Sequence, residues 1–328
     1  MSTYRVFFGD YEVTELVESM TVEDSLSELA VRVTLEMAYP VELPTPALSG
    51  PARISGIPPG ASTPVYLIGS SAYPAVIWEA RRSRIQTATR FLTVVVYDRL
   101  IYLMKSEDEY LHQAGTATAR LRRYARDWEL PLATLADTGQ KLKLIVYREK
   151  SLVEMIKADL RETAQKSGKL YAVRMTPSGI SLIQIGAGSP TWSLDGLVES
   201  GEEVNRTLEG TVTKVKIYGQ GSDTARAPLL ATLTQNADKY GTLQKTIRKG
   251  KNDALATVKA EANDLLGGPD ETLTLPCAVS IPTLRAGDEV RYGGADWIVC
   301  KVRHEWKPAD SMNVTLGGVA YVRRTYFR

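Results

Sequence analysis

The chain has 328 residues, of which 44% are hydrophobic and 24% are charged. This length and composition are typical of a soluble globular protein with two or three domains, and they exclude a chain that is mostly disordered. The formal net charge of +2 gives no overall attraction to nucleic acid or to a membrane surface.

The first residues lack the basic segment and long apolar core of a signal peptide, and no apolar run reaches the roughly 18 residues of a membrane helix. We therefore expect a protein made in the cytoplasm without stable membrane association. Cys277 and Cys300 lie in apolar runs, which favours buried, unreactive thiols. A disulfide between them is possible if their strands are neighbours, but nothing in the sequence requires it. His112 and His304 lack zinc-ligand spacing, so no metal or cofactor is predicted.

The region up to about residue 110 is predicted to be mostly antiparallel β. Residues 29–37 alternate between apolar and polar side chains, which is typical of a half-buried strand. Further runs of β-forming residues occupy positions 4–8, 65–69, 75–79 and 91–97. Several short strands joined by short turns favour a small barrel or sandwich.

A proline-rich segment, residues 40–64, interrupts these strands. Proline cannot donate to a β ladder or continue a helix, so the segment is predicted to be a long surface loop that lies outside the core. A contact arm for a neighbouring molecule and a floppy loop are both open interpretations. If the segment is a contact arm, its interface candidates are Pro44, Pro46, Pro58 and Pro59.

Residues 111–197 are predicted to form an α+β module. Apolar residues at helical intervals indicate a helix over 117–128, and its arginines are expected to lie mostly on the opposite, solvated face. Ser151 and Glu154 form a capping box for a second helix, 151–167, which Gly168 ends. A β-hairpin over about 170–185 follows it. The arginines in question are Arg120, Arg122, Arg123 and Arg126.

From about residue 198 the pattern returns to β, with a helical insertion predicted at about 223–268. Residues 273–281 alternate cleanly, and the outward position of Pro276 places this strand at a sheet edge. The last strand is predicted over roughly 312–322, with a bulge or bend at the adjacent glycines 317 and 318.

The sequence offers little for catalysis. A histidine base would have to be His112 or His304, and a structural hydrogen bond is the simpler interpretation of His304. Adjacent carboxylates at 107–109 and 202–203 could act as in glycosidases, but such clusters in polar connecting segments are more often solvated. No phosphate-binding glycine motif is present. We therefore predict that the protein is not an enzyme.

Basic residues gather on the first helix, in the insertion and at the C-terminus. Nucleic-acid contact is one interpretation. A solvated helix face and a protein-binding tail fit better, so no specific nucleic-acid partner is predicted. The basic residues of the insertion are Lys245, Arg248, Lys249 and Lys251. The interface candidates of the tail are Arg323, Arg324, Tyr326, Phe327 and Arg328.

Five segments, in this order along the chain, resemble the baseplate hub family of phage tails. They are residues 5–20, Tyr97–Ser106, the helix 151–167 with the strand after Gly168, Leu284–Val290 and Trp297–His304. The family includes the XkdQ/YqbQ-type proteins of Bacillus prophages. The late control protein D of P2-like phages and the hub part of type VI secretion spikes are more distant members. Two features depart from the family pattern: segment 40–64 is longer, and Arg-Ala-Gly-Asp at 285–288 stands where Pro-Gly-Asp is expected.

The resemblance implies a structural hub that is a homotrimer. Each subunit would supply two small β-barrel domains of the tail-tube type, in residues 1–110 and 198–328, with the α+β module 111–197 between them. Six barrels in a three-fold ring would adapt a six-fold tail tube to a three-fold spike. The implied partners are the tail tube, spike and other baseplate proteins, with the tape measure protein as a further candidate. The implied location is a virion or phage-tail-like particle assembled in the host cytoplasm.

Two other functions stay open. A tail-associated cell-wall hydrolase would need Glu107 and Glu109 in a cleft. A host carbohydrate- or receptor-binding module would need Trp78, Trp192 and Trp306 to line one groove, and core positions are the simpler interpretation of these tryptophans.

Overall fold

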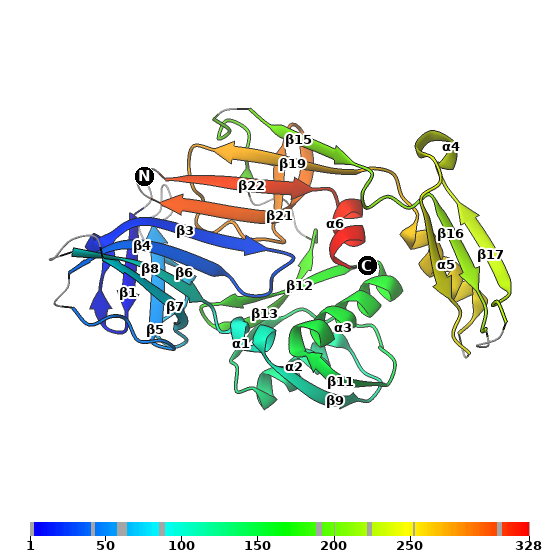
Figure 1. The fold of residues 1–328 in the computed structure, drawn as a ribbon, viewed down its shortest axis with the longest axis horizontal. Helices are drawn as coiled ribbons and strands as arrows, with labels where there is room; N and C mark the ends of the chain where they lie inside the picture. The colour runs from blue at the N-terminus through cyan, green and yellow to red at the C-terminus, as the bar shows by residue number, and fades with distance from the viewer. Residues whose placement is uncertain are drawn as a thin grey trace. The chain divides into compact units, whose positions relative to one another are not determined.

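The computed structural model describes residues 3–40, 43–57, 64–84, 89–187, 192–199, 201–221, 225–251, 253–306 and 310–327. The chain is mainly β with several helices, as predicted (Figure 1). Its internal contacts divide it into two units. The first unit contains Met1–Glu203 and Thr274–Leu316, and the second contains Val204–Leu273 and Gly317–Arg328. The finer division at residues 110 and 197 stays a prediction.

The first unit is built on strands from both ends of the chain. Its N-terminal strands are β1 (Thr3–Phe8), β2 (Tyr11–Glu12), β3 (Val17–Ser25), β4 (Arg32–Pro40), β5 (Pro51–Ile57), β6 (Val65–Ile68), β7 (Ala75–Arg84) and β8 (Thr89–Tyr97), with the short 3-10 helix Thr14–Leu16 after β2. Its C-terminal strands are β14 (Trp192–Ser193), β20 (Glu289–Tyr292), β21 (Ala295–Trp306) and β22 (Ser311–Gly317), and β19 (Asp270–Cys277) enters it from the second unit.

These strands share one sheet, because β21 pairs with β3 from Lys301 opposite Ser25 to Trp306 opposite Met20. From β19 to β2 the order is β19-β22-β21-β3-β4-β8-β7-β5-β1-β2, with β20 beside β21, β14 beside β20 and β6 beside β5. Among the described residues this path is open at β2, so no closed barrel is found. The arrangement of two barrels stays a prediction.

The alternation in β4 explains why this sheet forms. Val33, Leu35 and Met37 are fully buried, as the period of two predicted. Leu35 lies opposite Met20 of β3 on one side and opposite Val94 of β8 on the other. Apolar residues of three strands therefore meet in one core, and each fully buried side chain contributes about 1.5–3 kcal/mol.

The prediction that residues 40–64 form a surface loop was wrong for their centre. Residues 51–57 form β5, which pairs with β1 from Ala52 opposite Phe8 to Ile57 opposite Thr3. Ala52 and Ile54 lie in the core with at most 1% of their surface exposed. Pro51 is tolerated because it is the first residue of the strand, and no proline follows it within β5.

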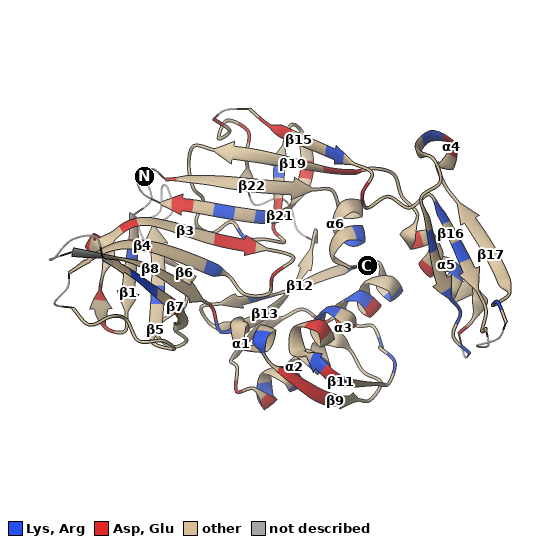
Figure 2. Ribbon diagram, viewed as in Figure 1, with Lys and Arg blue, Asp and Glu red and all other residues tan. Residues whose placement is uncertain are grey.

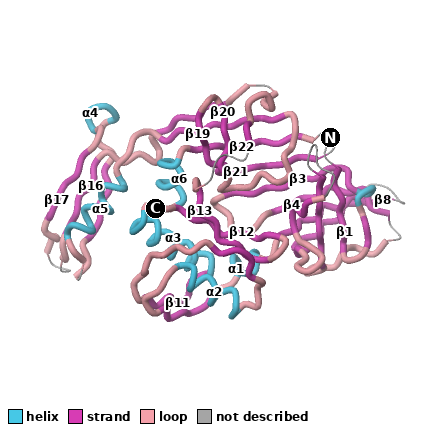
Figure 3. The backbone as a smooth tube through the Cα atoms, turned by 180° about the vertical axis from the view of Figure 1, so that it is seen from behind, coloured by secondary structure: helices cyan, strands magenta, loops and turns pink. Residues whose placement is uncertain are grey.

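A helical module follows β8 within the first unit (Figure 3). Helix α3 has the predicted capping box of Ser151 and Glu154, and it ends at Gly168 in the left-handed conformation, with φ of 72°. Helix α3 packs against α2 and against β12, which pairs with β13 as the predicted hairpin. The elements are α1 (Leu100–Lys105), β9 (Glu107–His112), α2 (Ala117–Asp127), β10 (Leu132–Leu135), β11 (Ile145–Ser151), α3 (Leu152–Ser167), β12 (Leu170–Thr176) and β13 (Gly179–Ile185).

The second unit is centred on a three-stranded sheet of order β17-β16-β18. Helix α5 covers one face, where Val258 and Ala262 pack against Val215 and Ile217 of β16. The elements of this unit are β15 (Glu203–Thr207), β16 (Lys214–Tyr218), β17 (Leu229–Thr234), α4 (Ala237–Tyr240), β18 (Gln244–Arg248), α5 (Leu255–Leu265) and α6 (Val319–Tyr326).

The prediction of a helical insertion at about 223–268 was therefore only half correct. Residues 229–234 and 244–248 are strands, and β18 runs parallel to β16 with Ile247 opposite Ile217. Short apolar runs fit helix and strand periods equally, so the partner strand β16 decided the conformation. Helix α5 agrees with the prediction.

Two predictions for the C-terminal strands were also wrong. The last strand ends at Gly317, and a helix begins after Gly318, because Val322 turns inward and is fully buried. The Pro276 segment is not a free edge, since the Glu199 N–H donates to the Pro276 carbonyl and Val198 bridges Cys277. Cys277 and Cys300 are buried and are not joined in a disulfide, and burial raises the pKa of Cys277 to about 11.

Candidate interaction surfaces

A buried polar network holds the helical module together. The Asp159 carboxylate of α3 accepts hydrogen bonds from Arg120 of α2 at 2.6 Å and from Tyr147 of β11 at 2.8 Å. The Tyr124 hydroxyl lies 3.5 Å from the same carboxylate and 2.9 Å from Nε2 of His112. Arg120 and Asp159 are at most 3% exposed. The network therefore ties α2, α3, β9 and β11 to one another.

The titration of this network suits a structural role. Burial raises the pKa of Asp159 and of the Tyr124 and Tyr147 hydroxyls. Burial, helped by the positive charge of Arg120, lowers the pKa of His112 to about 4. His112 therefore stays neutral at pH 7 inside the module.

The arginines of α2 lie mostly on a solvated face, as predicted, and Arg120 is the exception. Arg120 is 3% exposed, whereas Arg122, Arg123 and Arg126 are exposed. The helical spacing indicates the burial of Arg120. This residue follows the buried Ala117 by three positions and precedes Tyr124 by four, so it lies on the apolar face of the helix.

His304 makes the structural hydrogen bonds that the sequence suggested. Its Nε2 lies 3.1 Å from the Leu284 carbonyl, and its Nδ1 lies 3.0 Å from the Ser280 hydroxyl. Ser280 in turn accepts a hydrogen bond from Tyr4. A carbonyl can only accept, so Nε2 carries the proton and Nδ1 is the acceptor. Burial lowers the pKa of His304 to about 4, which keeps it neutral.

A second charged cluster surrounds the turn at 284–288. Arg285 forms an ion pair with Asp24 of β3 and donates to the Met175 carbonyl of β12. Arg174 of β12 donates to Asp288 at 2.9 Å. Gly287 has φ of 91°, which favours glycine in this turn. The arginine that departs from the family pattern thus links β3, β12 and the turn.

The predicted carboxylate candidates are solvent-exposed. Glu107, Asp108 and Glu109 lie on strand β9, so their assignment to a connecting segment was wrong. Glu109 pairs with Arg148 of β11 at 3.5 Å. Glu202 and Glu203 are also exposed. No group of three or more His, Cys, Asp or Glu side chains in the described part of the chain could hold a metal ion. No helix among the described residues is long and apolar enough to span a membrane.

The structure describes two of the four predicted proline contacts. Pro44 is exposed and Pro46 is half-buried, in an irregular segment before β5 where Leu48 is 65% exposed. The Tyr39 hydroxyl donates to the Pro44 carbonyl and holds the start of this segment. Pro58 and Pro59 lie outside the described residues.

The predicted C-terminal contacts are partly engaged within the second unit. Arg324 pairs with Asp270 at 2.6 Å, and both side chains are at most 15% exposed. Phe327 is buried, while Arg323 and Tyr326 are half-buried. The tail is thus a folded helix rather than an extended arm. Arg328 lies outside the described residues.

The tryptophans occupy different surroundings. Trp306 packs against the core of the first unit, with its ring 5.0 Å from that of Tyr4. Trp78 is 38% exposed, and its ring lies edge-to-face with the rings of Tyr97 and Tyr102. Trp192 is half-buried in β14. The core interpretation therefore holds for Trp306.

The ribbon of β9 and β11 exposes an apolar surface that the sequence did not single out. Leu111 and Val146 face each other across the two strands and are 49% and 43% exposed. Leu144, next to β11, is 55% exposed. The opposite face of the ribbon is buried at Tyr110 and His112. Neighbouring exposed apolar side chains of this kind are typical of protein contact surfaces.

A family model described as YQBQ-like matches residues 69–316. The chain belongs to the YQBQ-like family. It is 29% identical over 202 residues to the uncharacterized protein YqbQ of Bacillus subtilis, an alignment that covers 60% of this chain and 62% of YqbQ, less than two thirds of that relative. It is 28% identical over 234 residues to the phage-like element PBSX protein XkdQ of the same organism, which covers 66% of this chain and 70% of XkdQ.

Solved structures share the fold of this family member along nearly its whole length. The 43 kDa tail protein of prophage MuSo2 from Shewanella oneidensis matches with a TM-score of 0.71, at 11% identity, over 98% of this chain and 99% of that one. The tail protein from Neisseria meningitidis matches with a TM-score of 0.70, at 13% identity, over 97% and 96%. An Escherichia coli type VI secretion component matches with a TM-score of 0.54, at 11% identity, over 100% and 79%. At these identities the likeness shows a common fold.

Proposed function

We propose that this chain is a structural, non-enzymatic baseplate hub of a phage tail or phage-tail-like contractile particle. The observation that carries the proposal is the fold, which phage tail proteins share over 97–98% of the chain. Membership of the YQBQ-like family supports it, since a relative at 28% identity belongs to a phage-like element.

The hub is proposed to be a homotrimer. Each subunit contributes two β regions, residues 1–110 and 198–328, which act as two barrel units flanking the module 111–197. Three subunits then present six similar units, which suits a six-fold tail tube on one side and a three-fold spike on the other. The pairing of β21 with β3 joins strands of the two β regions within one subunit, so the two regions would enter the ring together.

The chemistry of the described residues favours a structural role. The histidines are buried and hydrogen-bonded, and Glu109 is exposed and ion-paired, so no observation favours the cell-wall hydrolase. The proposed partners are the tail tube, spike, other baseplate and tape measure proteins. The proposed location is the assembled particle, formed in the host cytoplasm. The surface of Leu111, Leu144 and Val146 is a candidate contact with a neighbouring subunit or partner.

The test is to image the purified chain in negative stain and to measure its mass in solution on the same sample. A three-fold ring with about six lobes and three times the monomer mass is expected. If the chain is a monomer, the measurement is repeated after co-expression with the neighbouring spike and tube genes. A monomer that binds neither protein would overturn the proposal.

A further inference from the structure

One face of the β17-β16-β18 sheet is open within the second unit. Helix α5 covers the face of Val215 and Ile217, so alternate residues of each strand point to the other face. The register places Lys216 between Thr232 of β17 and Thr246 of β18, and both threonines are exposed. The open face carries Lys214, Lys216 and Tyr218 from β16 and Gln244, Thr246 and Arg248 from β18.

The charged side chains on this open face are all positive. None of β16, β17 and β18 contains aspartate or glutamate. Elsewhere in the unit, Asp270 pairs with Arg324, Asp253 accepts the Gly250 N–H, and Glu261 lies on α5. Figure 2 shows basic residues in blue along β16. Lys214 and Lys216 are therefore not neutralised by a carboxylate of their own sheet.

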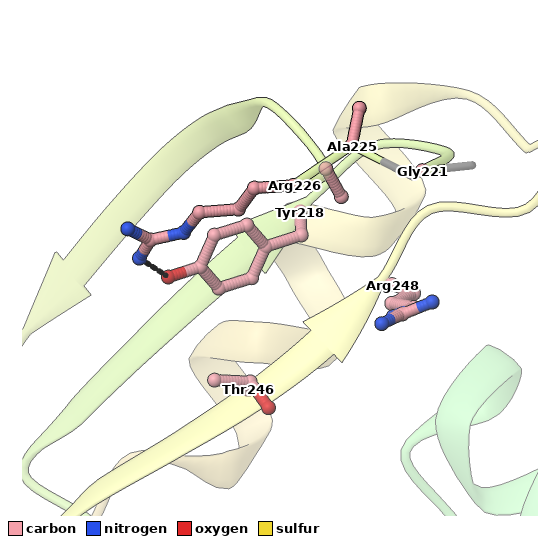
Figure 4. Close-up of a pocket in the computed structure, with 7 residues that line it drawn as sticks. Tyr218, Gly221, Ala225, Arg226, Thr246 and Arg248 are labelled. Carbon is pink, nitrogen blue, oxygen red and sulfur yellow. Dashed lines mark hydrogen bonds between the residues drawn. The ribbon is translucent and has the colours of Figure 1, made fainter. Parts of the chain in front are cut away.

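A shallow pocket lies at one end of the open face, which is called the cationic face from here on. Tyr218 lines it with Arg226, Thr246 and Arg248, and its volume is about 330 Å³ (Figure 4). Arg226 donates to the Tyr218 hydroxyl at 3.3 Å, and its guanidinium lies 5.9 Å from the ring centroid. The rest of the wall consists of the small residues Gly221, Ala225 and Ala227, which leave the space beside the ring open.

We propose that this face binds single-stranded nucleic acid without sequence preference. One base stacks on Tyr218 in the pocket, where Arg226 and Arg248 contact its phosphate. The backbone continues along Lys216 and Lys214, which repeat at about 6.8 Å, the length of two strand residues. Aromatic platforms combined with cations that follow the backbone are the usual means of binding a single strand. This proposal goes beyond the hub function and does not depend on it.

The pocket favours a single strand over other polyanions. In a duplex the bases are paired and stacked, so no base can enter a pocket beside an aromatic ring. An acidic peptide could pair with the lysines but offers no flat aromatic base to fill the space beside Tyr218. The volume lies within the range of small-ligand pockets, which is consistent with one nucleotide.

The first experiment measures binding of a fluorescent 20-nucleotide oligothymidine to the full chain by anisotropy over a range of salt concentrations. The variant Lys214→Gln/Lys216→Gln should bind more weakly. The slope of log K against log [salt] is negative, and it should become shallower by roughly 1.4, at about 0.7 for each lost phosphate contact. The charge-matched control is Lys239→Gln/Lys259→Gln on α4 and α5, which should keep the wild-type slope.

The second experiment tests the pocket with the same probe. Tyr218→Ala should weaken binding about 5- to 150-fold through lost stacking, while Tyr218→Phe should retain most of the affinity. Arg248→Gln changes an exposed residue and should weaken binding without loss of fold. Circular dichroism confirms the fold of each variant.

Three outcomes would overturn the proposal. The first is the absence of oligothymidine binding at low salt. The second is an equal loss of affinity in the control variant, which would indicate that binding depends only on the net charge of the protein. The third is duplex DNA or polyglutamate competing as well as unlabelled oligothymidine; in the case of polyglutamate the face would be assigned to an acidic protein. A trimer seen in the imaging experiment would stand under each of these results.

Discussion

Asp24 of β3 and Arg285 of the turn before β20 form a mostly buried ion pair although 261 positions separate them in the sequence. The same Asp24 carboxylate lies within hydrogen-bond distance of the Ala286 N–H, and the Arg285 guanidinium also reaches the Met175 carbonyl. One arginine therefore joins the N-terminal strands, the helical module and the C-terminal strands of the first unit.

Arg285→Met should destabilise the first unit. The substitution leaves Asp24 largely buried without its partner, which typically costs about 3–5 kcal/mol. Chemical denaturation monitored by circular dichroism measures the change in unfolding free energy. The control is Arg291→Met, whose exposed pair with Asp296 is worth about 0–1 kcal/mol. Equal effects of the two substitutions would show that the Asp24 pair has no special role.

Arg120→Met should destabilise the helical module by a similar amount, about 3–5 kcal/mol, because Asp159 would lose its buried partner. Replacing both residues, as Arg120→Met/Asp159→Leu, should restore part of this loss, since no unpaired charge then remains buried. The same denaturation assay is used, with Arg123→Met of the exposed face as control. An unfolding free energy that is lower for the double variant than for the single variant would contradict this account.

The stability contributed by His304 should be lost in acid. Its folded pKa of about 4 lies below the ordinary value of 6.5, so the unfolded chain binds a proton that the folded chain does not. This contribution is present above pH 6.5 and falls by about 3 kcal/mol as the pH drops to 4. Urea denaturation at pH 7 and pH 4.5 measures it.

His304→Gln isolates this effect from other titrating groups. Asp98 acts in the opposite direction, since burial raises its pKa to about 7 and its folded form binds a proton more readily than the unfolded form. The unfolding free energy of the variant should therefore decline less than that of the wild type between pH 7 and pH 4.5. Parallel curves for the two proteins would show that His304 does not titrate in this range.

Leu275→Asp should unfold the C-terminal strands. Leu275 is fully buried in β19, so the substitution places a charge in the core and should cost more than about 4 kcal/mol. Asn313→Asp, at an exposed position of β22, is the matched control and should change the stability by less than about 0.5 kcal/mol. Thermal unfolding of both variants provides the comparison.

Val146→Lys should weaken assembly without harming the fold. The residue is 43% exposed beside Leu111, so its replacement should change the unfolding free energy by less than about 0.5 kcal/mol. A charge at the centre of this apolar surface should lower the trimer fraction or the binding of a partner protein, as read from the mass in solution. Val319→Lys, at another exposed valine, is the control. Unchanged assembly would remove this surface from the proposal.

The sequence by itself determined the elements whose signal is local. The alternation around Val33 and Leu35 specified β4, and Ser151, Glu154 and Gly168 specified both ends of α3. Such elements are set by the period of burial and by hydrogen bonds within a few residues, which a sequence displays directly. The order of the family motifs along the sequence likewise indicated the YQBQ-like family.

The tertiary structure alone decided the features that depend on distant partners. Strand β5 forms inside the proline-rich segment because β1 offers it a ladder, and β18 is a strand because β16 lies beside it. The pairing of Arg285 with Asp24 and the cationic face around Lys216 likewise join residues that are far apart or on different strands. A ladder or ion pair between distant residues leaves no periodic mark on either segment, so only the folded chain reveals it.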